Sequence, residues 1–139
     1  WDTFINLNLN YDKRNQKFKT SDGFYSNYFV NIPMVSTNYT ITSGYTYKVY
    51  SELFENNISS LGFYIKGASS LTDKDIKLSE RLYIPGRNLR GFVTGKVGPK
   101  DGDDYIGGNF VSSLNFKSTL PQLLRLLLQV LFLSIRLRN

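Results

Sequence analysis

The sequence lacks two residue types on which many enzyme sites depend. None of its 139 residues is a cysteine or a histidine. Without cysteine there is no disulfide framework and no thiolate nucleophile, and without histidine the commonest metal ligand and general base is absent. No pair of acidic residues suggests acid and base catalysis either. We therefore expect a protein that is not an enzyme and that holds no metal and no cofactor.

Long apolar runs are also missing before the final stretch. No segment approaches the roughly eighteen uninterrupted apolar residues of a membrane-spanning helix, and no basic segment followed by an apolar run marks a signal peptide. A membrane β-barrel would show no such run either, so the absence does not indicate a soluble protein. Because Trp1 already lies within an alternating pattern, we interpret the chain as a fragment of a longer protein.

Aromatic residues, in contrast, are abundant, and polar residues stand between them. Tyrosine and phenylalanine number ten each, and the formal net charge is +6. Aromatic and hydroxyl side chains suit a pleated surface, so the composition favours strands. The positive charge is compatible with nucleic acid, with anionic lipid or with simple solubility, and it does not choose among them.

Several segments alternate between apolar and polar residues with the period of two that is typical of half-buried strands. In the clearest, Tyr39 to Leu53, most odd positions are apolar and most even positions are polar. Pro33 is expected to end the second segment because proline cannot donate to a ladder, and Glu55 to Asn57 is short enough for a hairpin turn. The predicted strands span residues 1–11, 24–32, 39–53, 61–66 and 110–120. Their alternating short and long connections predict an all-β antiparallel meander.

Two architectures fit such a meander. A soluble sandwich or lipocalin-like barrel would point the apolar face inward, whereas an outer-membrane barrel would point it at lipid and line its lumen with the polar face. Aromatic-rich apolar faces and the alternation of connection lengths favour the membrane barrel. The polar faces carry charged residues among small ones, namely Lys48, Glu52, Lys66 and Lys117. We predict that residues 1–121 form about five strands of a transmembrane β-barrel.

The final stretch, residues 122–139, does not follow this pattern. It is a leucine-rich run interrupted by Arg125, Arg136 and Arg138. It is too short and too interrupted to span a bilayer as a helix, and it has no clean polar face for an interfacial one. We interpret it as a non-native tail, for instance the product of a frame change near Leu124.

A long segment without apolar periodicity, residues 79–109, precedes the last predicted strand. Its run from Gly91 to Val97 has three residues between the glycines where a phosphate-binding loop needs four. Its Arg90-Gly91-Phe92 begins like the RNA-stacking strand of an RNA-recognition domain, but the further aromatic residues are missing. The acidic cluster from Asp101 to Asp104 lacks the spacing of a calcium loop. We therefore expect no nucleic-acid partner and interpret the acidic cluster as solvated loop.

The glycines of this loop allow the chain to turn tightly and to enter a confined space. If that space were a barrel lumen, Arg90 would be a buried guanidinium that needs a carboxylate or several carbonyls. A solvated surface loop is the alternative, and the residues alone leave both open.

The loop contains an ordered series of short motifs, namely Glu80-Arg81-Leu82-Tyr83, Gly86, Leu89-Arg90-Gly91-Phe92, Val97-Gly98-Pro99 and Ile106-Gly107-Gly108-Asn109. This series resembles that of the BamA family, outer-membrane assembly factors of the bacterial surface antigen superfamily. A second match, Phe18-Lys19-Thr20 to Gly23, is similar to the family's periplasmic Phe-Pro-Thr turn, with Lys19 in place of proline and one extra residue.

The resemblance implies a C-terminal barrel fragment of a protein that folds and inserts other outer-membrane β-barrel proteins. It implies that the loop is extracellular and folds back into the barrel, with a structural tip of Leu89, Arg90, Gly91 and Phe92. The supporting residues that it implies are Glu80, Tyr83, Gly86, Gly98, Pro99, Gly107, Gly108 and Asn109.

The resemblance also implies a location and partners. The location is a Gram-negative-type bacterial outer membrane, and the partners are outer-membrane lipid, client β-barrel proteins and accessory assembly lipoproteins. The family's periplasmic domains, and the acidic strand that pairs with the loop arginine, have no counterpart in this sequence. A two-partner secretion transporter of the same superfamily, or a passive porin-like barrel, is the alternative.

Overall fold

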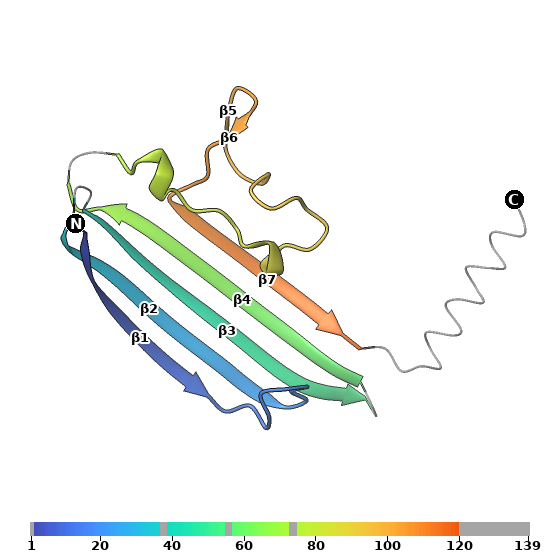
Figure 1. Cartoon of the computed structure of the whole chain (residues 1–139). Helices are drawn as coiled ribbons and strands as arrows, with labels where there is room; N and C mark the ends of the chain where they lie inside the picture. The colour runs from blue at the N-terminus through green and yellow to red at the C-terminus, as the bar shows by residue number, and fades with distance from the viewer. Residues whose placement is uncertain (1, 37–38, 55–56, 73–74, 120–139) are drawn as a thin grey trace, which may run out of the picture.

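The computed structural model describes residues 2–36, 39–54, 57–72 and 75–119. Its main element is one five-stranded antiparallel sheet whose strands follow each other in chain order. Figure 1 shows them as neighbouring arrows. They are β1 (Thr3–Asp12), β2 (Gly23–Val35), β3 (Thr40–Phe54), β4 (Asn57–Ser70) and β7 (Phe110–Ser118). The predicted all-β antiparallel meander is confirmed.

The connection between β4 and β7 contains the remaining regular structure, two short 3₁₀ helices and a small hairpin. These are η1 (Leu78–Glu80), η2 (Gly86–Asn88), β5 (Lys100–Asp101) and β6 (Asp104–Tyr105). No helix in the described ranges is long and apolar enough to cross a membrane.

The strand register joins the apolar positions of all five strands into one continuous face. Leu7 lies opposite Val30, and Leu9 lies opposite Tyr28. The same row continues through Tyr45 and reaches Ile65 on β4. This face is open, with Leu9 70% exposed and Leu114 71% exposed. Residues two apart point to the same side of a strand, so the alternation in the sequence becomes one uncovered apolar surface.

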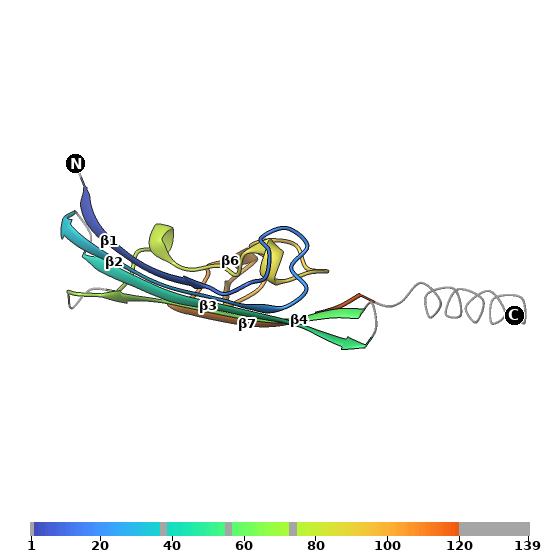
Figure 2. The same cartoon turned by 90° about the horizontal axis from the view of Figure 1, so that it is seen from below.

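The register joins the polar positions on the other face. Lys48 of β3 lies opposite Gly62 of β4, which lies opposite Asn115 of β7. Figure 2 shows that the loop and both 3₁₀ helices lie on one side of the sheet. Thr46, Lys48 and Ser60 line a cavity together with residues of η2, so this side is the polar face.

The hydrophobic core of the described part is small, and it lies between the sheet and the loop. Leu82 is 7% exposed and packs there with residues of β4 and β7. The core consists of Tyr64, Ala68, Ile76, Leu82 and Val111, with Ile84 partly buried against them. The loop is therefore a packed layer on the sheet.

The prediction that Pro33 ends the second strand is wrong, because β2 continues to Val35. The missing N–H is tolerated here because the pairing of β2 with β3 stops at Asn31. Pro33 is opposite Phe4 on β1, beside a register shift between Thr3 and Phe4. Proline is accepted at such irregular, singly paired positions of a sheet.

Some predictions fall outside the described residues. They concern Trp1, Asn38 at the end of the second connection, Glu55 and Asn56 of the predicted hairpin turn, Leu120 and the leucine-rich tail at residues 122–139. The division into a barrel domain at residues 1–121 and a non-native tail stays a prediction.

Candidate functional site

The long loop between β4 and β7 returns along the polar face of the sheet. It leaves the sheet after Ser70, yet its helix η2 shares a cavity with Tyr50, Ser60 and Lys117. Ser60 and Ser70 are about ten residues apart on β4, or roughly 33 Å at about 3.3 Å per residue. Figure 1 places η2 beside β7, and Figure 2 places it on the same side of the sheet as η1. The loop therefore folds inward over the sheet, as the resemblance implied.

The loop is fastened where its two ends meet. Leu82 and Gly108 form an antiparallel bridge, in which the backbone nitrogen of each donates to the carbonyl oxygen of the other, with nitrogen-to-oxygen distances of 2.7 and 3.0 Å. The carbonyl of Asn109 accepts the N–H of Ala68 on β4 at 2.8 Å. Gly107 has φ of 68°, and a Cβ there would lie 2.9 Å from the carbonyl oxygen of Leu82. Only glycine combines that backbone conformation with that lack of space.

Two predicted supporting side chains make hydrogen bonds across the loop. The hydroxyl of Tyr83 donates to the carbonyl of Tyr105 at 2.9 Å, which ties the start of the loop to its end. The hydroxyl of Thr40 donates to the carboxylate of Glu80, which ties η1 to β3. The first contact closes the loop on itself, and the second attaches the loop to the sheet.

The remaining supporting residues shape the backbone of the loop. Gly86 begins η2. Gly98 has φ of 132°, and the carbonyl of the following Pro99 accepts the N–H of Ile106 at 3.0 Å. This bond brackets the β5–β6 hairpin, which carries the acidic cluster at an exposed position. The cluster lies in a solvated turn.

The predicted tip lies over the polar face but is only partly enclosed. Leu89 is partly buried at the end of η2, and Gly91 has φ of 85°. Arg90 is exposed, lines the cavity, and forms no ion pair with another described residue. Phe92 is 62% exposed. The structural role of the tip stays a prediction.

A cavity of about 330 Å³ separates η2 from the sheet. Arg87, Asn88 and Arg90 line it from the loop, and Lys48 and Lys117 line it from the sheet. None of the described residues around it is acidic. The cavity is therefore a small space with one sign of charge on the polar face.

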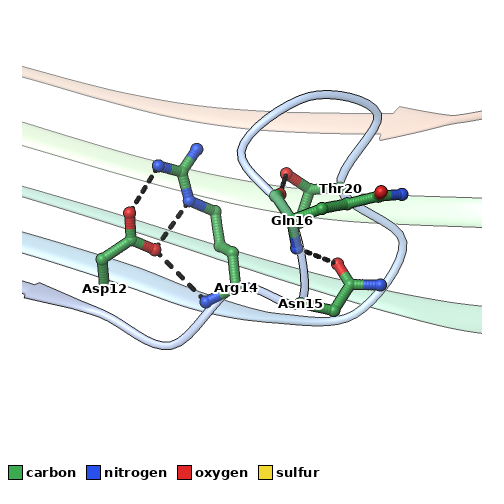
Figure 3. A network of polar contacts seen from close by, with 5 residues as sticks. All are labelled: Asp12, Arg14, Asn15, Gln16 and Thr20. Carbon is green, nitrogen blue, oxygen red and sulfur yellow. Dashed lines mark hydrogen bonds and ion pairs between the residues drawn. The ribbon is translucent and has the colours of Figure 1, made fainter.

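The turn between β1 and β2 is the second region that resembles the BamA family, and side chains organise it. Figure 3 shows that Arg14 donates through its side chain to both carboxylate oxygens of Asp12, at 2.8 and 2.7 Å. This hydrogen bonding lowers the pKa of the Asp12 carboxyl to about 2, so the carboxylate stays ionised beside the guanidinium at neutral pH. The hydroxyl of Thr20 donates to the carbonyl of Gln16 at 2.7 Å. Phe18 is 87% exposed.

The polar groups of the site form structural hydrogen bonds and a cluster of cations. Within the described residues no group of three or more histidine, cysteine, aspartate and glutamate side chains could hold a metal ion. The arrangement can fix a loop over the polar face of a sheet and can present positive charge beneath that loop.

These features define a class of protein. An antiparallel meander with an apolar outer face, a polar inner face and a loop folded over the inner face is the wall of a membrane β-barrel with a partly filled lumen. The chain belongs to the Omp85 superfamily, because the Omp85 superfamily domain matches residues 1–130. The BamA-like resemblance is thereby confirmed, and the location is an outer membrane, bacterial or mitochondrial.

One curated relative supports this membership. The chain is similar to a SAM50-like protein of Schizosaccharomyces pombe, with 35% identity over 63 residues. The match covers 45% of this chain and 13% of the length of that protein. No solved structure matches the chain.

Some of the site was not predicted from the sequence. The sequence pattern places Lys48 and Lys117 on the polar face, but it does not predict that they line one cavity with Arg87. The contact depends on the register of β3, β4 and β7, which periodicity does not specify. The signal that the sequence did contain is the two small residues Ser60 and Gly62 at alternate positions of β4, which leave room above the middle strand.

Proposed function

We propose that the chain is the loop-bearing part of the barrel of a BamA-type assembly factor. Such a protein folds and inserts β-barrel proteins into a Gram-negative-type bacterial outer membrane. The observation that supports the proposal most is the loop, described over residues 75–109, which lies on the polar face and is fastened there through family-like residues. Membership in the Omp85 superfamily supports a role in outer-membrane assembly or transport.

The proposed mechanism is mechanical and needs no catalysis. Incoming strands of client proteins pair with an exposed edge of the barrel, so that backbone hydrogen bonds supply the affinity. The loop fills part of the lumen and holds the wall in shape while that edge is open. In this account Arg90, Gly91 and Phe92 brace the wall from inside. Client β-barrel proteins, accessory lipoproteins and outer-membrane lipid are the partners.

The test of the brace is Arg90→Ala in the whole protein that contains this chain. We expect a several-fold loss of client assembly and a lower temperature of heat-modified migration, because the variant lacks the guanidinium that is proposed to bind a partner in the lumen of the whole barrel. Lys96→Ala is the matched control, since Lys96 is an exposed cation of the same loop that does not line the cavity. Equal behaviour of the two variants would refute the bracing role.

Depletion of the whole protein tests the assembly function itself. We expect unfolded client barrels to accumulate and several outer-membrane proteins to decrease together. If depletion left client barrels unchanged and stopped the export of one polypeptide, the protein would be a secretion transporter. If it changed only the passage of small solutes, the protein would be a porin-like channel.

A further inference from the structure

We propose that the cavity beneath η2 binds a small oxyanion of the phosphate class. The site is made by Lys48, Arg87, Arg90 and Lys117, together with neutral hydrogen-bond donors, and three apolar residues of β4 and β7 also line the cavity. The proposal goes beyond the assembly function and does not depend on it, because it concerns a ligand inside the wall rather than a client at its edge.

The sequence makes the floor of the cavity hollow. Ser60 and Gly62, two small residues on the same face of β4, occupy the middle of the floor. A Cβ at Gly62 would meet Lys48 Cγ at 3.7 Å and Asn115 Cβ at 3.8 Å, which is ordinary contact. The neighbouring strands carry longer side chains, so the middle strand forms a depression between two raised rows.

Cations from three separate segments meet around this depression. Lys48 comes from β3, Lys117 comes from β7, and Arg87 and Arg90 come from the loop. None of the four forms an ion pair with another residue of the described ranges. Like charges around a small space repel one another, and an anion at the centre would add an attraction to each of the four cations that offsets this repulsion.

The chemistry of the lining selects an oxyanion. Guanidinium groups recognise the oxygens of phosphate or carboxylate with paired N–H donors, whereas lysine acts as a point charge. Asn88 and Asn115 add neutral amide donors, and Tyr50 adds a hydroxyl. One carboxylate opposite Arg90, as the family resemblance implies, would still leave three cations. A doubly or triply charged ligand therefore fits the site better than a single carboxylate.

The position of the cavity favours a free anion over the phosphate of a lipid. The cavity lies on the polar face beneath the loop, whereas lipid would cover the opposite, apolar face. A volume of about 330 Å³ admits phosphate with some of its hydration, or pyrophosphate.

Lys66 provides a matched control. It lies on the same face, on β4, and carries the same charge, but it does not line the cavity. Its ammonium lies 5.9 Å from the ring centre of Phe29, on the side of the sheet nearer β2. Replacing it changes the charge of the polar face by the same amount as replacing one cavity lysine.

The experiment is calorimetric titration of inorganic phosphate and of pyrophosphate into the whole protein in detergent, with ionic strength held constant by sodium chloride. We expect saturable binding that is weakened severalfold by Lys48→Gln or Lys117→Gln alone, each of which removes one charged contact, and roughly tenfold or more by the two together. Lys66→Gln is expected to bind like the unmodified protein. Absence of saturable binding, or equal weakening by Lys66→Gln, would overturn the proposal.

Two further arms make the result specific. Gly62→Val fills the hollow without changing any charge, and in a folded variant we expect it to abolish binding; binding that persists in the folded variant would contradict the proposed location.

Competition with soluble dihexanoyl phosphatidic acid distinguishes the sources of the phosphate group. No displacement assigns the site to a free anion as proposed, and displacement would overturn that assignment in favour of a lipid headgroup. Neither arm measures client assembly, so failure here is separate from failure of the proposed function.

Discussion

Gly107 is the residue at which the loop and the sheet constrain each other most closely. Its φ of 68° lies in the left-handed region, and a Cβ would come within 2.9 Å of the Leu82 carbonyl oxygen and 3.0 Å of the Tyr83 ring. The neighbouring Gly108 makes both hydrogen bonds of the bridge to Leu82. A side chain at Gly107 would therefore push apart the two ends of the loop.

We predict that Gly107→Ala loosens the loop, and Gly102→Ala is its control. Both glycines have positive φ, so both variants incur about 1–2 kcal/mol for the left-handed conformation of alanine. A Cβ at Gly102 meets nothing within 4 Å, so only Gly107→Ala adds a steric clash. The readout is the rate at which protease cuts the loop in the folded whole protein. Similar rates for the two variants would contradict the assigned packing.

Residue-level prediction from the sequence was uneven for physical reasons. Residues that the resemblance placed at the ends of the loop, such as Glu80, Tyr83 and Gly108, make specific contacts because those ends are fixed by adjacent strands. The tip is different. Arg90 has no ion-pair partner within the described residues, so its proposed bracing role depends on contacts that this chain does not supply.

At the scale of strands, the predicted faces agree with the register, and the second and fourth predicted strands were too short. The fourth strand was predicted at residues 61–66, but β4 spans Asn57–Ser70. Its first residues do not alternate in polarity, because a polar network holds them. The amide of Asn57 donates to the hydroxyl of Ser118 at 3.1 Å, and Ser59 is buried beside it. Because polar residues make these hydrogen bonds, the start of β4 lacks the alternation of apolar and polar residues from which a strand is predicted.

The two faces make opposite predictions for a charge introduced on β1. Leu7 is on the apolar face, and Asn8 follows it on the polar face. We expect Leu7→Lys to lower the free energy of unfolding from phospholipid vesicles by about 2–4 kcal/mol if the site lies near the bilayer midplane. Asn8→Lys is expected to lower it by less than about 1.5 kcal/mol, since that side chain meets water and loses only the hydrogen bond that Asn8 accepts from Asn27 at 2.6 Å. If Asn8→Lys lowered the free energy of unfolding more than Leu7→Lys does, lipid would lie against the polar face, which would contradict the assignment.

At the scale of the whole molecule, the described sheet has almost no interior of its own. Its apolar face is uncovered, and its small core depends on the loop. Within the described residues β1 and β7 are each paired on one edge only. Unpaired edges and an open apolar face are satisfied in a closed barrel surrounded by lipid, and they favour aggregation in water. The meander was predictable from local alternation, whereas loop packing required the three-dimensional register.

We therefore expect the isolated chain to aggregate in buffer and to remain dispersed only in detergent. Size-exclusion chromatography with light scattering, with and without detergent, measures this directly. A monodisperse protein in detergent-free buffer would count strongly against the membrane interpretation and in favour of a soluble β-sandwich.

The orientation of the sheet between lipid and lumen is the central claim, and spin labelling tests it most directly. The chain has no cysteine, so single cysteines can be placed at successive positions of β3 from Tyr45 to Val49 without background from its own sequence. With the whole protein in liposomes, oxygen accessibility should be high at odd positions and accessibility to a water-soluble nickel complex should be high at even ones. If the two accessibilities rose and fell together, or if oxygen accessibility were high at even positions, the proposed orientation of the sheet would be contradicted.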